Sequence, residues 1–340
     1  MASRDAQRFR LAVLNPGGHD REQHFPDGAG DVGHEHAPTN FHAYAACTRG
    51  SFLCETKSAL AIDMSILLLI RGDFKASERA LIALKKHGRK VAVSLKETGL
   101  HQIANQLRDR AKLSRFLRIV RQADACIAST PEAAELYRTI GGGSSAFIPT
   151  PYPLDDSHWD FSRPLDERRG IFIGTREWNV PSRNHLGALL IARQLSDATS
   201  EFVTVFNFDG RKGRELLSPL DFPAKKLRVL EKKNSYPEYL REIARHKIVL
   251  QLDTSFVPGQ VAGDALLCRV PCIGGNGAVD RLAFPQTSSI GETKELALRL
   301  LRERDFYREV VVAAEQNKRL TFASVASELE NFFARMAIGK

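Results

Sequence analysis

The sequence has few cysteines and no long apolar run. Its 340 residues include five cysteines, an odd number without the spacing of a disulfide framework. A disulfide-stapled secreted domain is therefore excluded, and a reducing compartment is expected. The longest apolar stretch, residues 64–70, is far shorter than the ~20 residues that span a bilayer. Because the first ten residues are polar, we expect no secretory leader and a cytoplasmic protein. Peripheral contact with the inner face of the membrane is the one membrane association that we consider.

Two of the cysteines lie four residues apart but do not predict a metal site. Cys268 falls on an apolar helical pattern, and Cys272 falls in a predicted strand. Free cysteine is commonly a small buried hydrophobe, which is the interpretation we adopt for both residues. No metal ligands are assigned in this sequence.

The net charge of +9 comes from 49 basic and 40 acidic residues. A basic surface attracts nucleotide phosphates, anionic lipids or nucleic acid, and charge alone does not choose among them. A basic amphipathic helix is predicted over residues 101–121. It could lie on an anionic membrane, or it could be an ordinary solvated helix face, which its few aromatic anchors favour.

Strand and helix patterns alternate along the chain, which predicts an α/β fold. The length allows two domains, and prolines and acids gathered at residues 149–168 mark a boundary between them. We predict an N-terminal domain of residues 1–160, a C-terminal domain of residues 161–320, and a closing helix, 321–340, that would pack back across the domains. The predicted strands and helices that carry this reading are 9–14, 64–70, 76–86, 91–95, 170–173 and 202–208.

The stretch 246–275 has the most distinctive order of elements. A β-branched apolar run, Lys247 to Leu252, is followed by a loop with Pro258, Gly259 and Gly263, a helical pattern at 264–268 and another strand at 270–273. A strand, a small-residue loop and a helix start present backbone N–H groups to a phosphate. An acid such as Asp264 at that place can accept a hydrogen bond from a sugar hydroxyl.

This order resembles the nucleotide-sugar half of the GT-B glycosyltransferases, in particular the group 1 retaining family. Residues 264–271, Asp-Ala-Leu-Leu-Cys-Arg-Val-Pro, correspond to the family's E-A-x-A-x-G-x-P, so Asp264 occupies the position of its second Glu. The sequence departs from the E-x7-E loop at Phe256, where the family has its first Glu. Further similar segments are 123–129, 147–152, 170–176, 236–244 and 317–326, so the match lies mainly in residues 123–333.

The resemblance implies a GT-B fold, two doubly wound Rossmann-like domains facing across a cleft, and a donor site in the C-terminal domain. Arg176 and Arg183 match the cations that hold the donor diphosphate, and Asp264 would hold the ribose. Backbone groups at the strand end and in loop 257–263 would contact the donor. The residues assigned to this contact are Gly174, Gly259, Gln260, Val261 and Gly263.

The N-terminal half offers residues for the acceptor side. Gly17 and Gly18 follow the first strand, where the backbone of GT-B enzymes approaches donor or acceptor; any tight turn also favours glycine. Glu97 follows the strand 91–95, at the edge where α/β sheets bind ligands, although a structural ion pair is an equal explanation. A histidine-rich segment is predicted to be a loop, either lining the cleft or on the surface; a zinc site is the third and least favoured interpretation, because its histidines do not form two compact pairs. Its histidines are His19, His24, His34, His36 and His42, and His42 or Glu97 would position the acceptor hydroxyl.

The predicted activity is transfer of a sugar from a nucleotide-diphosphate sugar to a hydroxyl of a glycan, lipid or other acceptor, with retention and without a metal. It is a hexosyltransferase-type activity, as in polysaccharide biosynthesis. A non-catalytic GT-B protein that binds glycan or nucleotide is the main alternative, because Phe256 replaces the first Glu. An epimerase or phosphorylase on the same fold is a second alternative. A nucleic-acid-modifying transferase would need a continuous basic stripe, and the scattered Lys and Arg residues disfavour nucleic acid as a partner.

Overall fold

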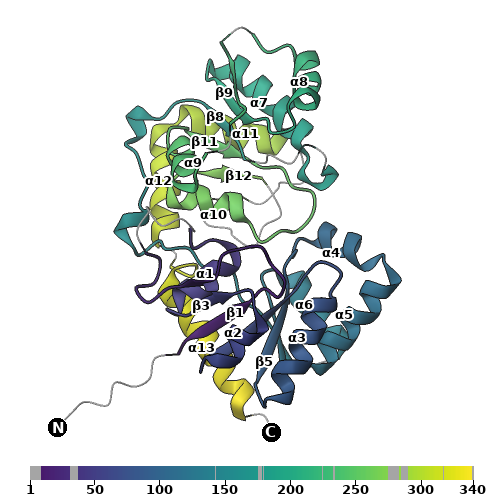
Figure 1. Ribbon diagram of the computed structural model, residues 1–340. Coiled ribbons are helices and arrows are strands. Elements are labelled where there is room, and N and C mark those ends of the chain that lie inside the picture. The colour runs from purple at the N-terminus through teal and green to yellow at the C-terminus, as the bar shows by residue number, and fades with distance from the viewer. Residues whose placement is uncertain are drawn as a thin grey trace, which may run out of the picture. The chain divides into compact units, whose positions relative to one another are not determined.

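The chain forms two compact units, each with its own mainly parallel sheet (Figure 1). Unit 1 comprises Met1–Asp156 and Arg319–Lys340, and unit 2 comprises Ser157–Lys318. The computed structural model describes residues 9–30, 37–141, 143–174, 178, 180–223, 225–232, 234–274, 283–284, 290–316 and 318–338. Unit 2 is thus inserted between the body of unit 1 and its last helix.

The sheet of unit 1 has the strand order β2-β3-β1-β4-β5-β6-β7 within the described residues. All neighbouring strands are parallel except β2, which pairs antiparallel with β3. The order reverses between β1 and β4, so the switch point of this doubly wound sheet lies there. The strands are β1 (Leu11–Leu14), β2 (Gln23–His24), β3 (Ser51–Leu53), β4 (Ser65–Ile70), β5 (Val91–Leu95), β6 (Ala125–Ala128) and β7 (Ser144–Phe147).

Helices cover the sheet of unit 1, and its inner strands β1, β4, β5 and β6 are mostly apolar and buried on both faces. Helix α1 packs against α13, and α3 packs against α5. The helices are α1 (Asn40–Cys47), α2 (Thr56–Ala61), α3 (Lys75–Lys86), α4 (Leu100–Leu107), α5 (Arg110–Gln122), α6 (Pro131–Ile140) and α13 (Phe322–Ile338).

Two predictions for unit 1 were wrong in detail. The segment 19–42, expected to be a loop, contains the strand β2, and β3 lies between two short helices where only the start of a helix was expected. The helix predicted over 101–121 is two helices. The first ends at Leu107, and Asp109 caps the start of the second, because its side chain accepts a hydrogen bond from the backbone N–H of Lys112 at 2.8 Å.

The sheet of unit 2 is parallel throughout its described strands, in the order β10-β9-β8-β11-β12-β13. This order reverses between β8 and β11, which places the switch point between those two strands. The strands are β8 (Ile171–Ile173), β9 (Val203–Phe206), β10 (Leu227–Leu230), β11 (Ile248–Leu250), β12 (Cys272–Ile273) and β13 (Ala283–Phe284). The prediction of an α/β protein with two doubly wound sheets is confirmed.

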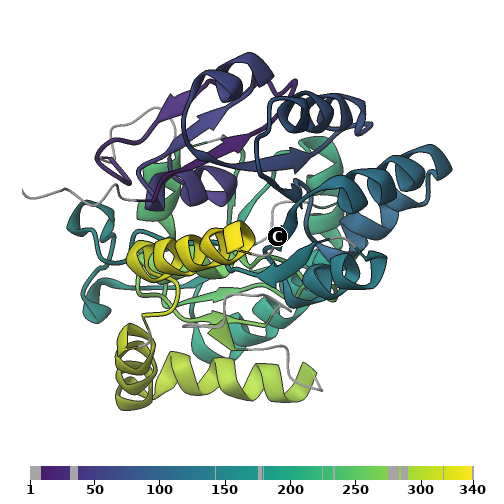
Figure 2. The same cartoon turned by 90° about the horizontal axis from the view of Figure 1, so that it is seen from below.

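Helix α7 packs against α11 in unit 2, and α11 meets α12 at a corner that is visible in yellow-green in Figure 2. The helices are α7 (His185–Thr199), α8 (Arg211–Leu217), α9 (Tyr236–Ile243), α10 (Gln260–Leu267), α11 (Ile290–Arg302) and α12 (Arg304–Gln316). Among the described parts of both units, helices long and apolar enough to cross a bilayer are absent.

Helix α10 begins earlier than the sequence predicted. Gly259 has a φ of 84°, a left-handed conformation that glycine adopts readily, and it turns the chain directly into the helix at Gln260. The segment expected to be a loop up to residue 263 is therefore partly helical. Asp264 lies one turn inside the helix and not at its start.

Candidate functional site

The switch point of unit 2 gathers most of the residues predicted to bind a donor. Gly174 follows β8, and Asp253 lies three residues beyond the end of β11, so both belong to the carboxyl edge of the sheet. Helix α10 begins from the loop after β11, and α7 begins from the segment after β8. Two helix N-termini thus belong to the edge at which open α/β sheets bind ligands.

Gly174 allows α10 to pack closely against β8. A Cβ atom at this position would lie 2.3 Å from Cγ1 of Val261, so a side chain does not fit there. The backbone N–H of Gly174 donates to the carbonyl of Leu250 at 2.9 Å, and that of Gly263 donates to the carbonyl of Gly259 at 2.9 Å. The expectation that the whole of loop 257–263 offers free N–H groups was therefore wrong, because Gly263 uses its own within the helix.

Arg183 forms an ion pair with a carboxylate that the sequence analysis had not singled out. Its Nη1 donates to Oδ1 of Asp253 at 3.2 Å, and Asp253 is fully buried. Gln251 donates to the other carboxylate oxygen. A buried carboxylate is costly without a cation, so the pair holds Arg183 in place at the edge of the sheet. The N–H of Thr254 donates to the carbonyl of Ser182 at 2.8 Å and ties the two loops together.

His185 is the first residue of α7 and is a second residue that the sequence analysis missed. It is 4% exposed, its ring lies 4.0 Å from that of Trp178, and neither ring nitrogen has a hydrogen-bond partner within the described part of the chain. Burial lowers the pKa of His185 to about 4. The imidazole is thus neutral near pH 7 and can accept or donate a hydrogen bond beside Arg183.

Asp264 is held by an aromatic neighbour. The hydroxyl of Tyr236 donates to Oδ1 of Asp264 at 2.6 Å, and Asp264 is 2% exposed. The ring of Tyr236 lies 6.1 Å from that of Trp159. This packing fixes the orientation of the carboxylate predicted to hold a ribose.

The carboxyl edge of unit 1 carries a separate polar cluster. Nδ2 of Asn15 donates to Oδ2 of Asp20 at 2.6 Å, and Nζ of Lys96 lies 3.4 Å from the same oxygen. Although partial burial raises the pKa of Asp20, the charges of Lys96 and His42 and the hydrogen bond from Asn15 bring it below its ordinary value. The ring of His42 stacks on Phe52 with 3.7 Å between centroids. His42 is therefore a member of this cluster, which we call the Asp20 cluster (Asn15, Asp20, His42 and Lys96).

The other residues predicted for the acceptor side follow β1 and β5 and differ in their contacts and exposure. Gly17 and Gly18 form the turn after β1, and Arg71, which follows β4, donates to the carbonyl of Gly17. Glu97 is exposed, and its carboxylate accepts from Nε2 of Gln102 at 3.4 Å. The switch point of unit 1 thus brings Gly17 and Arg71 together, while Glu97 belongs to the surface.

Three of the predicted residues lie outside the described ranges, namely Arg176, His34 and His36. Within those ranges, groups of three or more His, Cys, Asp and Glu side chains that could hold a metal are absent. Asp253 could have been found from the sequence, because it follows a predicted buried strand at its carboxyl end. Asp20 and Tyr236 carry no such signal.

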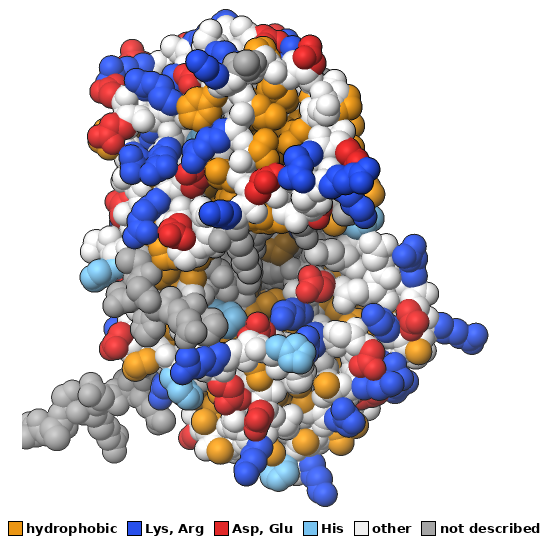
Figure 3. Space-filling model, turned by 45° about the horizontal axis from the view of Figure 1, so that its top comes forward, with side chains coloured by type: hydrophobic (Ala, Val, Ile, Leu, Met, Phe, Trp, Pro, Cys, Tyr) orange, Lys and Arg blue, Asp and Glu red, His pale blue; other side chains and the backbone are white. Residues whose placement is uncertain are grey.

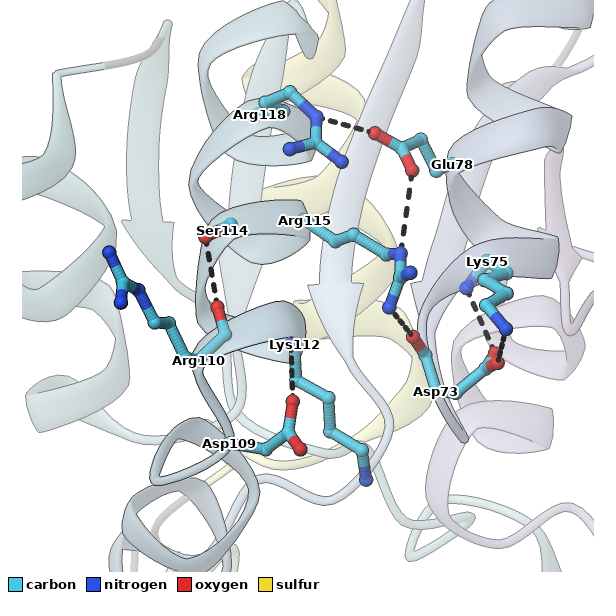
Figure 4. A network of polar contacts seen from close by, with 9 residues as sticks. All are labelled: Asp73, Lys75, Glu78, Asp109, Arg110, Lys112, Ser114, Arg115 and Arg118. Carbon is cyan, nitrogen blue, oxygen red and sulfur yellow. Dashed lines mark hydrogen bonds and ion pairs between the residues drawn. The ribbon is translucent and has the colours of Figure 1, made fainter.

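Surface charges of both signs are mixed. Figure 3 shows Lys and Arg side chains interspersed with Asp and Glu side chains, and the described residues on this face form no continuous basic stripe. On α5, Arg118 lies 2.8 Å and Arg115 lies 3.9 Å from the carboxylate of Glu78 on α3, as Figure 4 shows. Part of the positive charge of the segment 101–121 is therefore paired within unit 1.

Solved structures of low sequence identity share this fold. HepE from Anabaena, solved in complex with UDP, has a TM-score of 0.62 and 14% identity, covering 96% of this chain and 100% of that chain. The trehalose 6-phosphate synthase of Burkholderia multivorans has a TM-score of 0.60 and 9% identity, covering 97% and 96%. The pneumococcal O-GlcNAc transferase GtfA, in complex with UDP and GlcNAc, has a TM-score of 0.57 and 11% identity, covering 83% and 59%.

These proteins are glycosyltransferases of the GT-B fold, so the GT-B fold predicted from the sequence is confirmed. At such identities the likeness concerns the fold. No protein-family profile matches the sequence, and no curated protein matches it significantly.

Proposed function

We propose that this GT-B chain is a glycosyltransferase that moves a sugar from a nucleotide-diphosphate sugar, with a uridine nucleotide as the first candidate, to a hydroxyl of an acceptor. The observation that carries the proposal is the carboxyl edge of unit 2, where two helix N-termini, Arg183 and the buried Asp264 lie around the switch point of a fold shared with UDP-bound structures.

In this proposal the leaving diphosphate is stabilised by positive groups of unit 2. The nucleotide gains negative charge as the glycosidic bond breaks, and preorganised cations and helix N-termini stabilise that charge. Arg183 would supply the cation and Asp253 would hold it in position. Arg176 would be a second cation. The first-turn amides of α10, at Gln260 and Val261, and those of α7 would contact phosphate oxygens, with Gly174 and Gly259 allowing the close approach.

Asp264 would accept a hydrogen bond from the donor ribose. Tyr236 donates to one of its carboxylate oxygens at 2.6 Å and so sets the direction of the side chain. His185, neutral near pH 7, would donate a hydrogen bond from one ring nitrogen to the donor without adding charge. Retention at the anomeric carbon and independence from a metal are part of the same proposal.

Unit 1 would hold the acceptor through the Asp20 cluster. A carboxylate, an ammonium group and an imidazole side by side suit hydrogen bonds to the hydroxyl groups of a sugar. His42 and the backbone at Gly17 and Gly18 are the parts of this edge that we assign to acceptor positioning, with Glu97 at its exposed end. A glycan or a lipid-linked sugar is the acceptor class, and peripheral contact with an anionic membrane stays a prediction.

The test is ligand-induced thermal stabilisation by UDP, ADP and GDP, followed by release of nucleotide from the sugar donor that binds. A ligand at 100 times its Kd stabilises the folded state by about 2.7 kcal/mol. Asp264→Asn should abolish most of this shift. Arg183→Gln alone would leave Asp253 buried without its cation, so the double variant Arg183→Gln/Asp253→Asn is the better probe of diphosphate binding.

Arg214→Gln is the matched control, because Arg214 is exposed on α8 and pairs with Glu231 at 2.6 Å. It should keep the full shift. Binding without turnover against any acceptor would favour the alternative, a non-catalytic binding protein with Phe256 in place of the first Glu. If the nucleotides fail to stabilise the wild-type protein, the donor site is refuted.

A further inference from the structure

We propose that unit 2 has a second anion site, for a small organic phosphate, in a cavity at the amino edge of its sheet. The cavity has a volume of about 200 Å³. Its wall includes Arg169, two residues before β8, and Lys247, directly before β11. Gly174 and Asp253 follow the same two strands at their other ends, so the proposed donor site and this cavity belong to opposite edges of one sheet.

The cavity is positively charged. Its wall contains four cationic side chains and one carboxylate. The cations are Arg169, Lys247, Arg302 and Arg304, and the carboxylate is that of Asp166. A further carboxylate, Glu201, pairs with Nζ of Lys247 at 2.5 Å. Among the residues that the structure describes, two positive charges at the site therefore have no counter-charge. A phosphate monoester carries about −1.5 to −2 at pH 7, which balances this excess.

The arginines have N–H groups left for a ligand. Nη1 of Arg169 donates to the carbonyl of Arg168 at 2.6 Å, and Nη2 of Arg302 donates to the carbonyl of Ala198 at 2.8 Å. A guanidinium has five N–H donors, so these contacts, among the described residues, use a small part of each. Arg302 ends α11 and Arg304 begins α12, at the corner visible in Figure 2. Guanidinium groups from separate elements suit the several oxygens of a phosphate better than the two of a carboxylate.

Part of the cavity wall is apolar. It includes Leu165, Leu300 and Leu301, of which Leu300 and Leu301 are 2% and 8% exposed. The hydroxyl of Tyr307 accepts from Arg168 at 2.8 Å and donates to the carbonyl of Lys247 at 2.9 Å, which fixes its ring in the wall. Apolar side chains beside cationic groups in one cavity favour an anion that carries a short carbon skeleton over a hydrated inorganic ion.

The size of the cavity limits the ligand. Water occupies ~30 Å³ per molecule in the liquid, so the cavity corresponds to roughly six or seven waters. A three-carbon phosphate fits this space. Glycerol 3-phosphate is accordingly the probe, with glycerol and inorganic phosphate as its uncharged and skeleton-free counterparts.

Asp166 gives the test its sharpest variant. Its carboxylate lies 2.8 Å from Nη2 of Arg304, so it neutralises a guanidinium that lines the cavity. The negative charge of Asp166 also repels an incoming anion. Asp166→Asn should strengthen binding of glycerol 3-phosphate by about fivefold, and Arg302→Gln should weaken it by about the same factor or more. Opposite changes from two variants in one wall are hard to produce by a general loss of stability.

Calorimetric titration of the full-length protein with glycerol 3-phosphate measures these effects. Arg308→Gln is the matched control: Arg308 is exposed on α12 and pairs with Asp305 at 3.7 Å outside the cavity. It should leave the affinity unchanged, and so should Arg183→Gln/Asp253→Asn at the opposite edge. Glycerol should not bind, and inorganic phosphate should bind more weakly than the ester.

Several outcomes would overturn the proposal. They are the absence of binding at millimolar concentration, weaker binding in Asp166→Asn, and equal losses in Arg302→Gln and Arg308→Gln. Loss of binding in the carboxyl-edge double variant would also refute it, because the probe would then occupy the proposed donor site. The proposal does not depend on the proposed transferase activity, since every experiment measures the binding of a small ligand and none measures transfer of a sugar.

Discussion

At the scale of single residues, Gly174 decides how closely a helix approaches a strand. Gly174→Ala would place a methyl group 2.3 Å from Cγ1 of Val261. Overpacking of this kind typically costs about 1–3 kcal/mol, and we expect that loss in chemical denaturation. The same substitution in a Val261→Ala background should cost clearly less, because the nearest obstructing methyl group is gone. Equal costs in both backgrounds would show that this contact is not the cause.

His246 makes stability depend on pH. It is fully buried, with Nδ1 2.8 Å from the carbonyl of Glu242 and Nε2 2.8 Å from Oγ1 of Thr204. A carbonyl only accepts, so Nδ1 carries the proton and Nε2 accepts from the hydroxyl. Burial lowers the pKa of His246 to about 4, although Glu242 partly opposes the shift. The unfolded chain, with an ordinary histidine pKa near 6.5, therefore binds the proton more readily than the folded state.

The sign of the effect follows from this difference. The contribution of His246 to stability is complete above pH 6.5 and is lost as the pH falls towards 4, by about 2 kcal/mol at pH 5. Urea denaturation of the wild type at pH 7.5 and pH 5 should show the loss. His246→Gln should reduce the difference between the two pH values, and His185 should account for part of the remainder. An unchanged difference in His246→Gln would contradict the assignment.

At the scale of elements, the break between α4 and α5 depends on Asp109. Its carboxylate accepts from the N–H of Lys112 at 2.8 Å, so Asp109→Ala should destabilise the protein by about 1 kcal/mol. Glu78→Gln, which removes the partner of Arg115 and Arg118 in Figure 4, should cost less, because ion pairs that are partly open to solvent contribute little. Denaturation curves of the two variants give the comparison. A larger loss from Glu78→Gln would mean that the ion pairs, and not the cap, hold α5.

The elements that the sequence predicted well are those with a sustained period. The strand at 91–95 has the predicted bounds, and the helix at 75–86 differs from the prediction by one residue. β3 was missed because three residues are too few to show a period. The break at Asp109 was missed because apolar residues recur at helical spacing on both sides of it.

Only those residues of the candidate site that belong to a local sequence motif or to a strand end could be predicted from the sequence. Asp264 and Arg183 came from motifs, and Gly174 came from the end of a strand. Asp253 and Arg183 are 70 residues apart, and Tyr236 and Asp264 are 28 apart, so folding alone brings each pair together. A sequence pattern read along the chain does not contain such pairings.

At the scale of the whole molecule, the two units can be followed separately. The protein has two tryptophans, Trp159 and Trp178, and both belong to unit 2. Tryptophan fluorescence therefore reports on unit 2, while circular dichroism reports on both units. If UDP binds at the carboxyl edge of unit 2, it should raise the unfolding midpoint seen by fluorescence. At 100 times its Kd, UDP should increase the free energy of unfolding by about 2.7 kcal/mol. A shift seen by circular dichroism but absent from fluorescence would place the nucleotide in unit 1.

The position of α13 has a consequence for synthesis. This helix packs against α1 and buries Val325, Leu329, Phe332 and Phe333 in unit 1, yet it comes after the whole of unit 2 in the chain. A ribosome that translates from the N-terminus has therefore delivered every residue of unit 2 before unit 1 can close its core. The usual order of co-translational folding, with the N-terminal domain first, is reversed for the final step. Until α13 has been synthesised, the nascent chain leaves the face of α1 that α13 later covers without its packing partner.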